Sequence, residues 1–383
     1  MNQSLLAEFG TPTTRVEKAI TALQAGEGIL LVDDEDRENE GDLVMAAELV
    51  TPDDIAFMAT RACGLICVTL TPAQVDRLQL PMMVATNQTP LGTAFTVTVE
   101  AATGVSTGIS AADRARTVKV CADPSSAPND LISPGHVFPL RAMPGGVLQR
   151  TGQTEGSVDL ARLAGLEPAG VICEIMKQDG TMARMDDLRL FAAEHNLVIL
   201  SVADLIEYRL QHDRLVESVA QFDVTLGSNR KAVFRAHVYE ALPGIMRHEY
   251  VALTLGPIDD GDPVPIRAHV SNVTDDIFGA TTRPNSPTIQ QLIDAIVARG
   301  RGVILFLPAR ESLKDQLSMA LNPVESDRNN PIIREYGIGA QILLDLGVRK
   351  LLVISNNPHK LIGLNAWGFT SATQISLEEV NKQ

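Results

Sequence analysis

The sequence predicts two α/β domains, the first of them built around a mixed α+β sheet. At 383 residues the chain is longer than one hydrophobic core usually supports, and domains of about 150 residues suggest two. Short apolar runs bounded by turn residues, which suit buried strands, alternate with stretches of helical periodicity. The composition turns polar over residues 209–221, and we therefore expect domains 1–210 and 211–383.

The individual elements follow from periodicity and from helix start and stop signals. In the first domain we expect helices at 15–25, 52–61 and 203–210, and strands at 28–32, 170–176 and 197–202. In the second domain we expect strands at 233–238, 250–255, 264–270, 303–307 and 350–354, and helices at 286–300 and 339–346. Such alternation is typical of α/β domains.

Charge and composition narrow the choice of partners. A net charge of -15 argues against binding to nucleic acid or to anionic membranes, because both depend on clustered Lys and Arg. An anionic substrate would need a local basic pocket. No stretch approaches the ~20 apolar residues of a membrane span, and the first residues lack the pattern of a signal peptide. We expect a cytoplasmic protein.

The four cysteines have neither zinc-finger spacing nor the density of a secreted disulfide framework. Reduced, buried thiols are the expected state of Cys63, Cys67, Cys121 and Cys173. No cysteine follows residue 173.

The most unusual stretch is DDEDRENEGD, residues 33–42, which follows the apolar run of an expected strand. One interpretation is a solvated acidic loop, as most charge runs are. The other is a ligand site at a strand end, where a divalent cation with oxygen ligands neutralises the carboxylates. Arg37 in this stretch is either a salt-bridging scaffold or an anchor for a substrate oxyanion.

A second candidate is RTGQTEGSVDLARLAG, residues 150–165. Thr154 is the expected N-cap of a helix that ends at Gly165. Backbone N–H groups at a helix start, with Arg150 beside them, would form a phosphate site. The alternative is an ordinary capped helix.

Two further residues stand out by their surroundings. His136 lies among the Pro and Gly residues of SPGHVFPLRAMPGG, where it is either a structural residue in a rigid loop or a functional one. Glu174 interrupts the apolar strand VICEIM, so this carboxylate must be paired, protonated or functional. Desolvation there should raise its pKa toward the range useful for acid–base chemistry.

Together these segments resemble 3,4-dihydroxy-2-butanone-4-phosphate synthase, the riboflavin-pathway enzyme that converts ribulose 5-phosphate into the four-carbon phosphate and formate. The resemblance covers residues 15–209 and rests on DDEDRENEGD, SPGHVFPL, R-x-G-x-TE with VDLARLAG, and CEIMKQDGTMAR, in the family's order and spacing. It implies a homodimer with sites at the subunit interface, a sugar-phosphate substrate and Mg²⁺ or Mn²⁺ as cofactor.

The resemblance also implies a role for each matching residue. His136 and Glu174 would be catalytic, and Glu38 would ligate the metal ion. The substrate contacts would come from Arg37, Asp42, Arg150, Thr154 and Glu174, with Asp33 and Cys67 as further active-site positions of less defined role.

One position departs from this family's pattern. The family has His in RxGHTE as a metal ligand, and this chain has Gln153. An amide oxygen is a hard donor that Mg²⁺ accepts, so Gln153 would ligate directly or through water, or else the site is weakened. Because the other matching residues are all present, we expect retained activity.

The second half, from residue 214 to 371, resembles GTP cyclohydrolase II through DDIFGA, GRGVILFLPAR and YGIGAQILLDLGVRKLLVISNNPHKLIGL. That family holds zinc with three cysteines, and none is present here. The expected GTP loop reads PARESLKDQL, and the Asp-x-Arg pair keeps Arg334 but has Ile332 at the acid position. We therefore expect no zinc and no cyclohydrolase activity in this domain. SNNPHK would bind a nucleotide or serve in packing.

Two functions remain open at this point. The first is a metal-dependent lyase fused to an inactive cyclohydrolase-like domain. The alternative is a non-catalytic protein that binds a sugar phosphate or nucleotide and regulates flavin synthesis. Gln153 favours the alternative, whereas the intact acidic stretch, His136 and Glu174 oppose it, because buried ionisable groups are costly to keep without a function.

Overall fold

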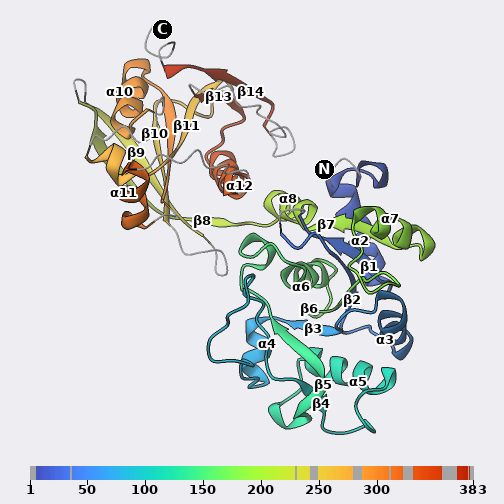
Figure 1. Ribbon diagram of the computed structural model, residues 1–383. Coiled ribbons are helices and arrows are strands. Elements are labelled where there is room, and N and C mark those ends of the chain that lie inside the picture. Colours follow the sequence, from blue (N-terminus) through green and yellow to red (C-terminus); the bar gives the residue numbers. More distant parts are fainter. Residues whose placement is uncertain are drawn as a thin grey trace. The chain divides into compact units, whose positions relative to one another are not determined.

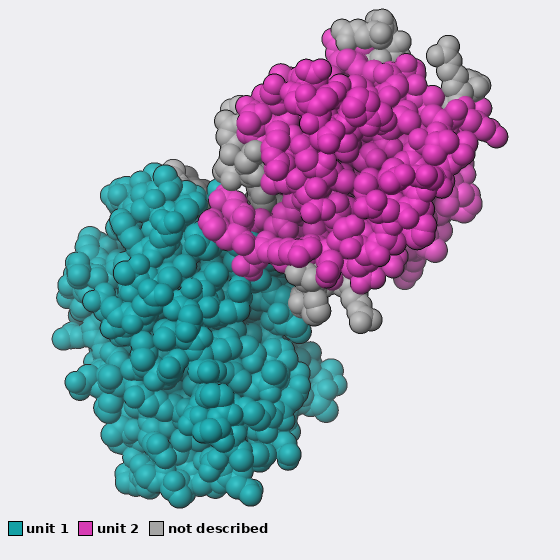
Figure 2. Space-filling model, turned by 180° about the vertical axis from the view of Figure 1, so that it is seen from behind, with its two compact units in different colours: residues 1–209 teal, residues 210–383 magenta. Residues whose placement is uncertain are grey.

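The computed structural model describes residues 6–34, 37–228, 231–241, 249–278, 287–309, 312–321, 331–355, 369–377 and 379. The chain divides into two compact units, Met1–Arg209 and Leu210–Gln383 (Figure 2). This division lies one residue from the expected one. Both units are α/β, as the sequence predicts, and each contains a mixed seven-stranded sheet (Figure 1).

The N-terminal sheet has the strand order β4-β5-β3-β6-β2-β1-β7. Its strands are β1 (Ile29–Val32), β2 (Gly41–Ala46), β3 (Cys67–Leu70), β4 (Val99–Ala101), β5 (Leu131–Arg141), β6 (Ala169–Glu174) and β7 (Val198–Ser201). The pairs β1–β7 and β3–β5 are parallel, and the other neighbouring pairs are antiparallel. Strands far apart in sequence therefore meet in the middle of the sheet.

Helices cover both faces of this sheet. Alternate residues of each strand point to opposite sides, so one strand contributes side chains to two core clusters. Leu30 and Val32 belong to one core cluster, which includes side chains of α3 (Pro52–Phe57), α5 (Ala111–Ala122) and α7 (Met185–Glu194). Ile29 and Leu31 belong to the other, with α2 (Pro12–Gln24), α6 (Gln153–Leu163) and α8 (Val202–His212). The short α4 (Pro72–Arg77) follows β3.

The C-terminal sheet has the order β14-β13-β11-β12-β10-β9-β8. Its strands are β8 (Val216–Leu226), β9 (Ala232–Ala241), β10 (Glu249–Leu255), β11 (Val264–Val270), β12 (Gly302–Leu307), β13 (Lys350–Ile354) and β14 (Ser371–Ile375). Its helices are α9 (Val273–Asp276), α10 (Ile289–Arg299), α11 (Leu313–Leu321) and α12 (Pro331–Asp345). The core between α10 and the sheet contains Phe234, Leu292, Ile296 and Ile304.

Several expected elements differ from the observed ones. The helix expected at 52–61 is α3 followed by a π-helical turn, Met58–Ala62, which ends where Cys63 adopts a left-handed backbone with φ 68°. The helix expected from residue 339 begins at Pro331, because its apolar periodicity extends further toward the N-terminus. Ser286, the expected start of α10, lies outside the described residues, and α10 ends at Gly300 as predicted.

The prediction of a loop around His136 is wrong, because this residue lies within β5. Strand pairing on both sides, with β3 and β4, outweighs the local preference of Pro134 and Pro139 for turns. No helix in the described residues is long and apolar enough to cross a membrane.

Candidate active site

The expected site residues meet on adjacent strands of the N-terminal sheet. Asp42 of β2 lies opposite Glu174 of β6, and Cys67 of β3 lies opposite Ile172 of β6 and Phe138 of β5. Residues opposite each other share a face of the sheet, as do residues two apart on one strand. Asp42, Glu174, Cys67 and His136 therefore share one face, the one covered by α2, α6 and α8.

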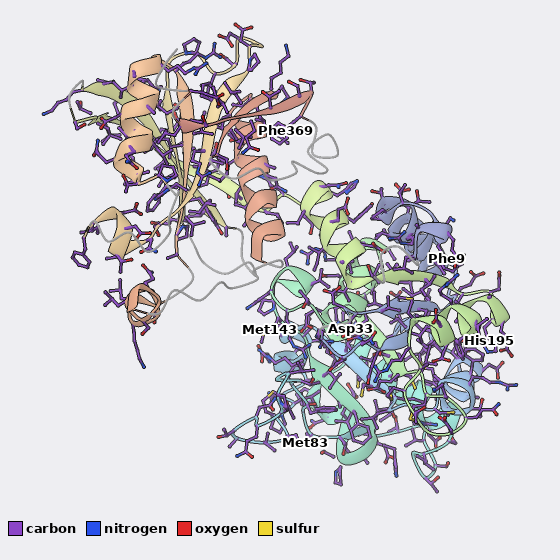
Figure 3. The ribbon with its side chains drawn as sticks, turned by 45° about the horizontal axis from the view of Figure 1, so that its top comes forward. Phe9, Asp33, Met83, Met143, His195 and Phe369 are labelled. Carbon is purple, nitrogen blue, oxygen red and sulfur yellow. The ribbon has the colours of Figure 1, made fainter. Side chains whose placement is uncertain are left out.

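Asp33 follows β1 and organises the acidic stretch. Its side chain is buried in the interior of the unit (Figure 3). One carboxylate oxygen accepts from Glu40 N at 2.8 Å, and the other accepts from Glu38 N at 3.0 Å and Arg37 Nη1 at 2.8 Å. This carboxylate folds the stretch back on itself, which agrees with an ordered site and not with a solvated acidic loop.

Arg37 joins the acidic stretch to the start of α6. Its Nη1 donates to Asp33 Oδ2 at 2.8 Å, to Glu38 Oε2 at 2.7 Å and to Gln153 Oε1 at 2.8 Å. Burial alone would lower the pKa of Arg37, but hydrogen bonds to Asp33 and Glu38 and their charges raise it above its ordinary value. The guanidinium therefore remains a fixed cation.

A second guanidinium approaches the same helix start. Arg150 Nη1 donates to the buried Glu155 Oε2 at 2.7 Å, and Nη2 donates to Leu91 O and Thr93 Oγ1, each at 3.2 Å. A Cβ added to Gly152 would lie 2.6 Å from Arg150 Nη1 and 2.9 Å from Arg37 Nη2. The two cations thus converge on Gly152.

The prediction that Thr154 caps this helix is wrong. Gly152 is the N-cap, with φ −121° and ψ 162°, and Thr154 is buried within the first turn. Glycine replaces a capping side chain here because the two guanidinium groups occupy the space that a Cβ would need. A helix N-terminus flanked by two cations is suited to bind a phosphate.

Glu174 is held by the segment that follows the π-helical turn. Leu65 N donates to Glu174 Oε2 at 2.8 Å, and a Cβ on Gly64 would lie 2.6 Å from the same oxygen. His136, with a half-exposed ring, pairs through Nδ1 with Glu100 Oε1 of β4. A fixed carboxylate and an oriented imidazole on one face can serve as proton acceptors and donors.

Burial dominates the electrostatics of the two neighbouring groups. It raises the pKa of the Asp42 carboxyl well above its ordinary value, and the charges of Glu174 and Glu38 add to this effect. Burial also raises the pKa of the Cys67 thiol, with further contributions from Glu174 and Asp42. Cys67 is therefore a protonated thiol and not a nucleophile.

Three supporting residues were missed by sequence reasoning. Arg184 Nη1 donates to Glu38 O at 2.8 Å and also to Asn39 O, so it fastens the acidic stretch. Glu155 orients Arg150, and Glu100 orients His136. The motifs CEIMKQDGTMAR and TE contain Arg184 and Glu155, whereas no local signal marks Glu100.

The oxygen donors near the acidic stretch suit a hard cation. Asp42 Oδ1 is buried and has no hydrogen-bond partner in the part of the chain that the structure describes. Glu38 is partly exposed and pairs with Arg37. Gln153 Oε1 accepts from Arg37, and its buried Nε2 has no hydrogen-bond partner within the described segments. Among the described residues no three His, Cys, Asp or Glu side chains form a ready metal cluster. A magnesium ion bound here would thus rely on Glu38, water and substrate oxygens.

The C-terminal unit contains a polar pair between β11 and α9. His269, 3% exposed, lies against Asp276, with Nε2 at 3.0 and 2.9 Å from the two carboxylate oxygens. Asp276 also accepts from Asn272 N and Ile289 N. The side chains of Ile332 and Arg334, and residues 356–360 of SNNPHK, lie outside the described part of the chain.

Comparison with known proteins assigns the family. Residues 17–208 match the family of 3,4-dihydroxy-2-butanone 4-phosphate synthase, and residues 219–376 match that of GTP cyclohydrolase II. The chain belongs to the 3,4-dihydroxy-2-butanone 4-phosphate synthase family and is an enzyme of that class. It carries a fused GTP cyclohydrolase II domain.

Full-length relatives have the same two-part organisation. The chain is 45% identical to riboflavin biosynthesis protein RibBA of Aquifex aeolicus, over 95% of this chain and 92% of the relative. It is 44% identical to RibBA of Salinispora arenicola, over 97% and 90%.

The chain is also similar to solved structures of 3,4-dihydroxy-2-butanone 4-phosphate synthases. RibBX, a two-domain 3,4-dihydroxy-2-butanone 4-phosphate synthase from A. baumannii, is 38% identical with a TM-score of 0.73, covering 94% of this chain and 99% of that one. A 3,4-dihydroxy-2-butanone 4-phosphate synthase in complex with two magnesium ions is 42% identical with a TM-score of 0.50, covering 52% and 97%.

Proposed function

We propose that the N-terminal unit converts ribulose 5-phosphate into 3,4-dihydroxy-2-butanone 4-phosphate and formate. The observation that carries this proposal is the convergence of Arg37 and Arg150 on Gly152 at the start of α6, beside the carboxylates of the acidic stretch. Such a site binds a phosphate at one end and leaves the sugar carbons facing ionisable groups.

The chain's own residues supply the remaining functions. Arg37, Arg150 and the N–H groups around Thr154 would bind the phosphate, and Asp42 would contact the sugar hydroxyls. Glu174 and His136 would move protons to and from the sugar carbons and oxygens, with Glu100 holding the imidazole by Nδ1. Asp33 would act by organising the loop, and Cys67 by lining the site as a neutral thiol.

We propose Mg²⁺ as the cofactor, with Mn²⁺ as a substitute of the same hard-donor class. Glu38 would hold the ion, and Gln153 would contact it through water, since its amide oxygen already accepts from Arg37. When bound, the ion would stabilise negative charge on neighbouring substrate oxygens.

Formate release from ribulose 5-phosphate tests this function. Purified protein is assayed with Mg²⁺, with EDTA as control, and beside the Gln153→His variant. Turnover that EDTA removes is the expected result. Formate release by the variant alone would identify Gln153 as the cause of lost activity. No formate release by either protein would favour the alternative, a non-catalytic sugar-phosphate or nucleotide binder that regulates flavin synthesis.

We also propose that the C-terminal unit lacks GTP cyclohydrolase activity and zinc. The supporting observation is the absence of any cysteine after residue 173, because a tetrahedral zinc site of thiolates needs those ligands. The full-length chain should release no formate from GTP. Stoichiometric zinc together with GTP turnover would overturn this proposal.

We further propose a homodimer whose subunits meet near the site. Apolar side chains around the site are 40–55% exposed, namely those of Leu65, Met82, Met83, Val84, Leu91 and Met143. Met83 and Met143 lie at the periphery of the N-terminal unit (Figure 3). Leu65 and Leu91 contact Glu174 and Arg150 through their backbones, so a second subunit would cover the substrate. Sedimentation at micromolar concentration should give twice the chain mass, and a monomer would exclude this arrangement.

The cytoplasm is the location we propose, since all four cysteines are free thiols and three of them are buried. A reporter fusion tests it, and export of the fusion would contradict it.

A further inference from the structure

A buried ion pair lies behind the loop that carries Arg150. Arg209, near the end of α8, contacts Asp159 of α6, with Nη1 at 2.7 Å from Oδ2. The two side chains are 9% and 6% exposed. No role in substrate binding follows from the motifs for either residue.

This pair holds the loop through its backbone. Asp159 Oδ2 also accepts from Val147 N at 2.8 Å, and Arg209 Nη1 also donates to Gly145 O at 2.9 Å. Arg150 N in turn donates to Gly146 O at 3.1 Å. The position of Arg150 therefore depends on Gly146, which lies between the two loop residues that the ion pair contacts, Gly145 and Val147.

A second acid of α6 completes the attachment. Glu155 lies one helical turn before Asp159 on the same helix. It accepts from Met143 N at 3.1 Å and from Arg150 Nη1 at 2.7 Å. The loop is thus fixed to α6 by Glu155 and by Asp159. The guanidinium of Arg209 pairs with Asp159.

Burial raises the pKa of the Asp159 carboxyl, and the charge of Arg209 opposes this rise. Without the guanidinium, the buried carboxylate would lose its counterion, and the bond from Val147 N would weaken or the loop would move to hydrate the acid.

We propose that Arg209 is a positioning residue for the substrate phosphate: acting through Asp159, it holds residues 145–150 so that Arg150 points to the start of α6. This inference rests on the proposed function, because it assigns the phosphate to Arg150. Its readout is affinity for phosphate groups, which loss of stability alone would not change.

The chain offers a matched control pair at the other end of α8. Arg15 of α2 pairs with Asp204 of α8 at 2.6 Å, and the two side chains are 2% and 0% exposed. Arg15 Nη1 also donates to Leu6 O and Gly10 O, which lie near the N-terminus and not in the loop before α6. Arg15→Met therefore breaks an equally buried pair without touching that loop.

The experiment compares KM for ribulose 5-phosphate, kcat and the inhibition constant of inorganic phosphate in the full-length protein. Arg209→Met should raise KM and the phosphate inhibition constant by about tenfold, with kcat changed by less than about threefold. Arg15→Met should lower the thermal midpoint and leave both affinities unchanged. Equal affinities in the two variants would overturn the proposal.

Two further variants keep the test decisive if Arg209→Met does not fold. Arg209→Lys should restore phosphate affinity to within about threefold of the wild type, because the contacts with Gly145 O and Asp159 Oδ2 both come from Nη1, which an ammonium group can replace. Gly146→Ala should weaken it, since Gly146 has φ 59° and an added Cβ would lie 2.3 Å from the Asp159 oxygens and 2.6 Å from Arg209 Nη1. Unchanged phosphate affinity in Gly146→Ala would count against the proposal.

Calorimetric titration with inorganic phosphate separates this inference from the proposed function. If the wild type releases no formate, the proposed function fails, and weaker phosphate binding by Arg209→Met still supports the positioning role. A wild type that releases no formate and binds no inorganic phosphate overturns both.

Discussion

Two regions of the molecule, one in each unit, differ in how their buried polar side chains are paired. At the candidate site of the N-terminal unit, Asp42 Oδ1 and Gln153 Nε2 are buried and have no hydrogen-bond partner among the described residues. In the C-terminal unit, His269 and Asp276 bond to each other, and Asp276 also accepts from two backbone N–H groups. A buried polar atom without a partner costs about 1–3 kcal/mol, so the first arrangement suits a ligand site and the second suits packing.

The C-terminal unit has a hydrophobic core, although no cysteine follows residue 173. Its core of Phe234, Leu292, Ile296 and Ile304 lies between α10 and the sheet. Hydrophobic burial of this kind depends on area and not on ligand chemistry. Such a core needs no thiolate ligands to hold the unit together.

The largest expected effect is the loss of formate release when Glu174, a proposed acid–base residue, is replaced. Glu174→Gln should lower formate release by about 10³-fold, because an amide cannot exchange the proton. The thermal midpoint should stay within about 1 °C, because the glutamine oxygen still accepts from Leu65 N. Both quantities are measured on one preparation. Near-normal turnover would remove Glu174 from the catalytic role.

The opposite result is expected for the polar pair of the C-terminal unit. His269→Asn should reduce the free energy of unfolding of that unit by about 3 kcal/mol, since it strands a buried carboxylate. Formate release should not change. Arg235→Gln is the control, because it breaks an ion pair to Asp223 that is 54% and 59% exposed and worth at most about 1 kcal/mol. Loss of formate release in His269→Asn would contradict a purely structural role for this pair.

A smaller effect is expected at residue 153. Gln153→His should lower the Mg²⁺ concentration for half-maximal formate release by about tenfold, because the amide oxygen is engaged by Arg37 whereas an imidazole offers a free lone pair. Gln149→His is the control, four residues earlier in the loop before α6, at a side chain that accepts from Gly145 N. An identical magnesium dependence in all three proteins would place residue 153 away from the ion.

The smallest effect concerns stability and pH at Asp42. The folded protein raises the pKa of this carboxyl from an ordinary value of 3.8, so its stability contribution is full below that pH and is lost as pH rises to the raised pKa. Asp42→Asn stays neutral, and without metal it should melt about 2–4 °C above the wild type at pH 8, with a smaller difference at pH 5. Melting curves in EDTA check this. A difference that grows toward low pH would reverse the sign and contradict a raised pKa.

Much of the candidate site was accessible to sequence reasoning because its motifs are local. Residues 33–42 and 150–165 each place several site residues within one turn or loop, so their chemistry is visible in order along the chain. The absence of cysteines after residue 173 is likewise a property of composition. The α/β class followed from the alternation of apolar runs, which depends on burial period alone.

The tertiary structure decided what distant segments do to one another. The order β5-β3-β6-β2 brings together strands that are far apart in the chain, and with it Cys67, Glu174 and Asp42. It also pairs His136 with Glu100 and places Arg209 behind the loop of Arg150. Local propensity cannot specify such contacts, because they depend on strand register and on which buried charge finds a counterion once the core has packed.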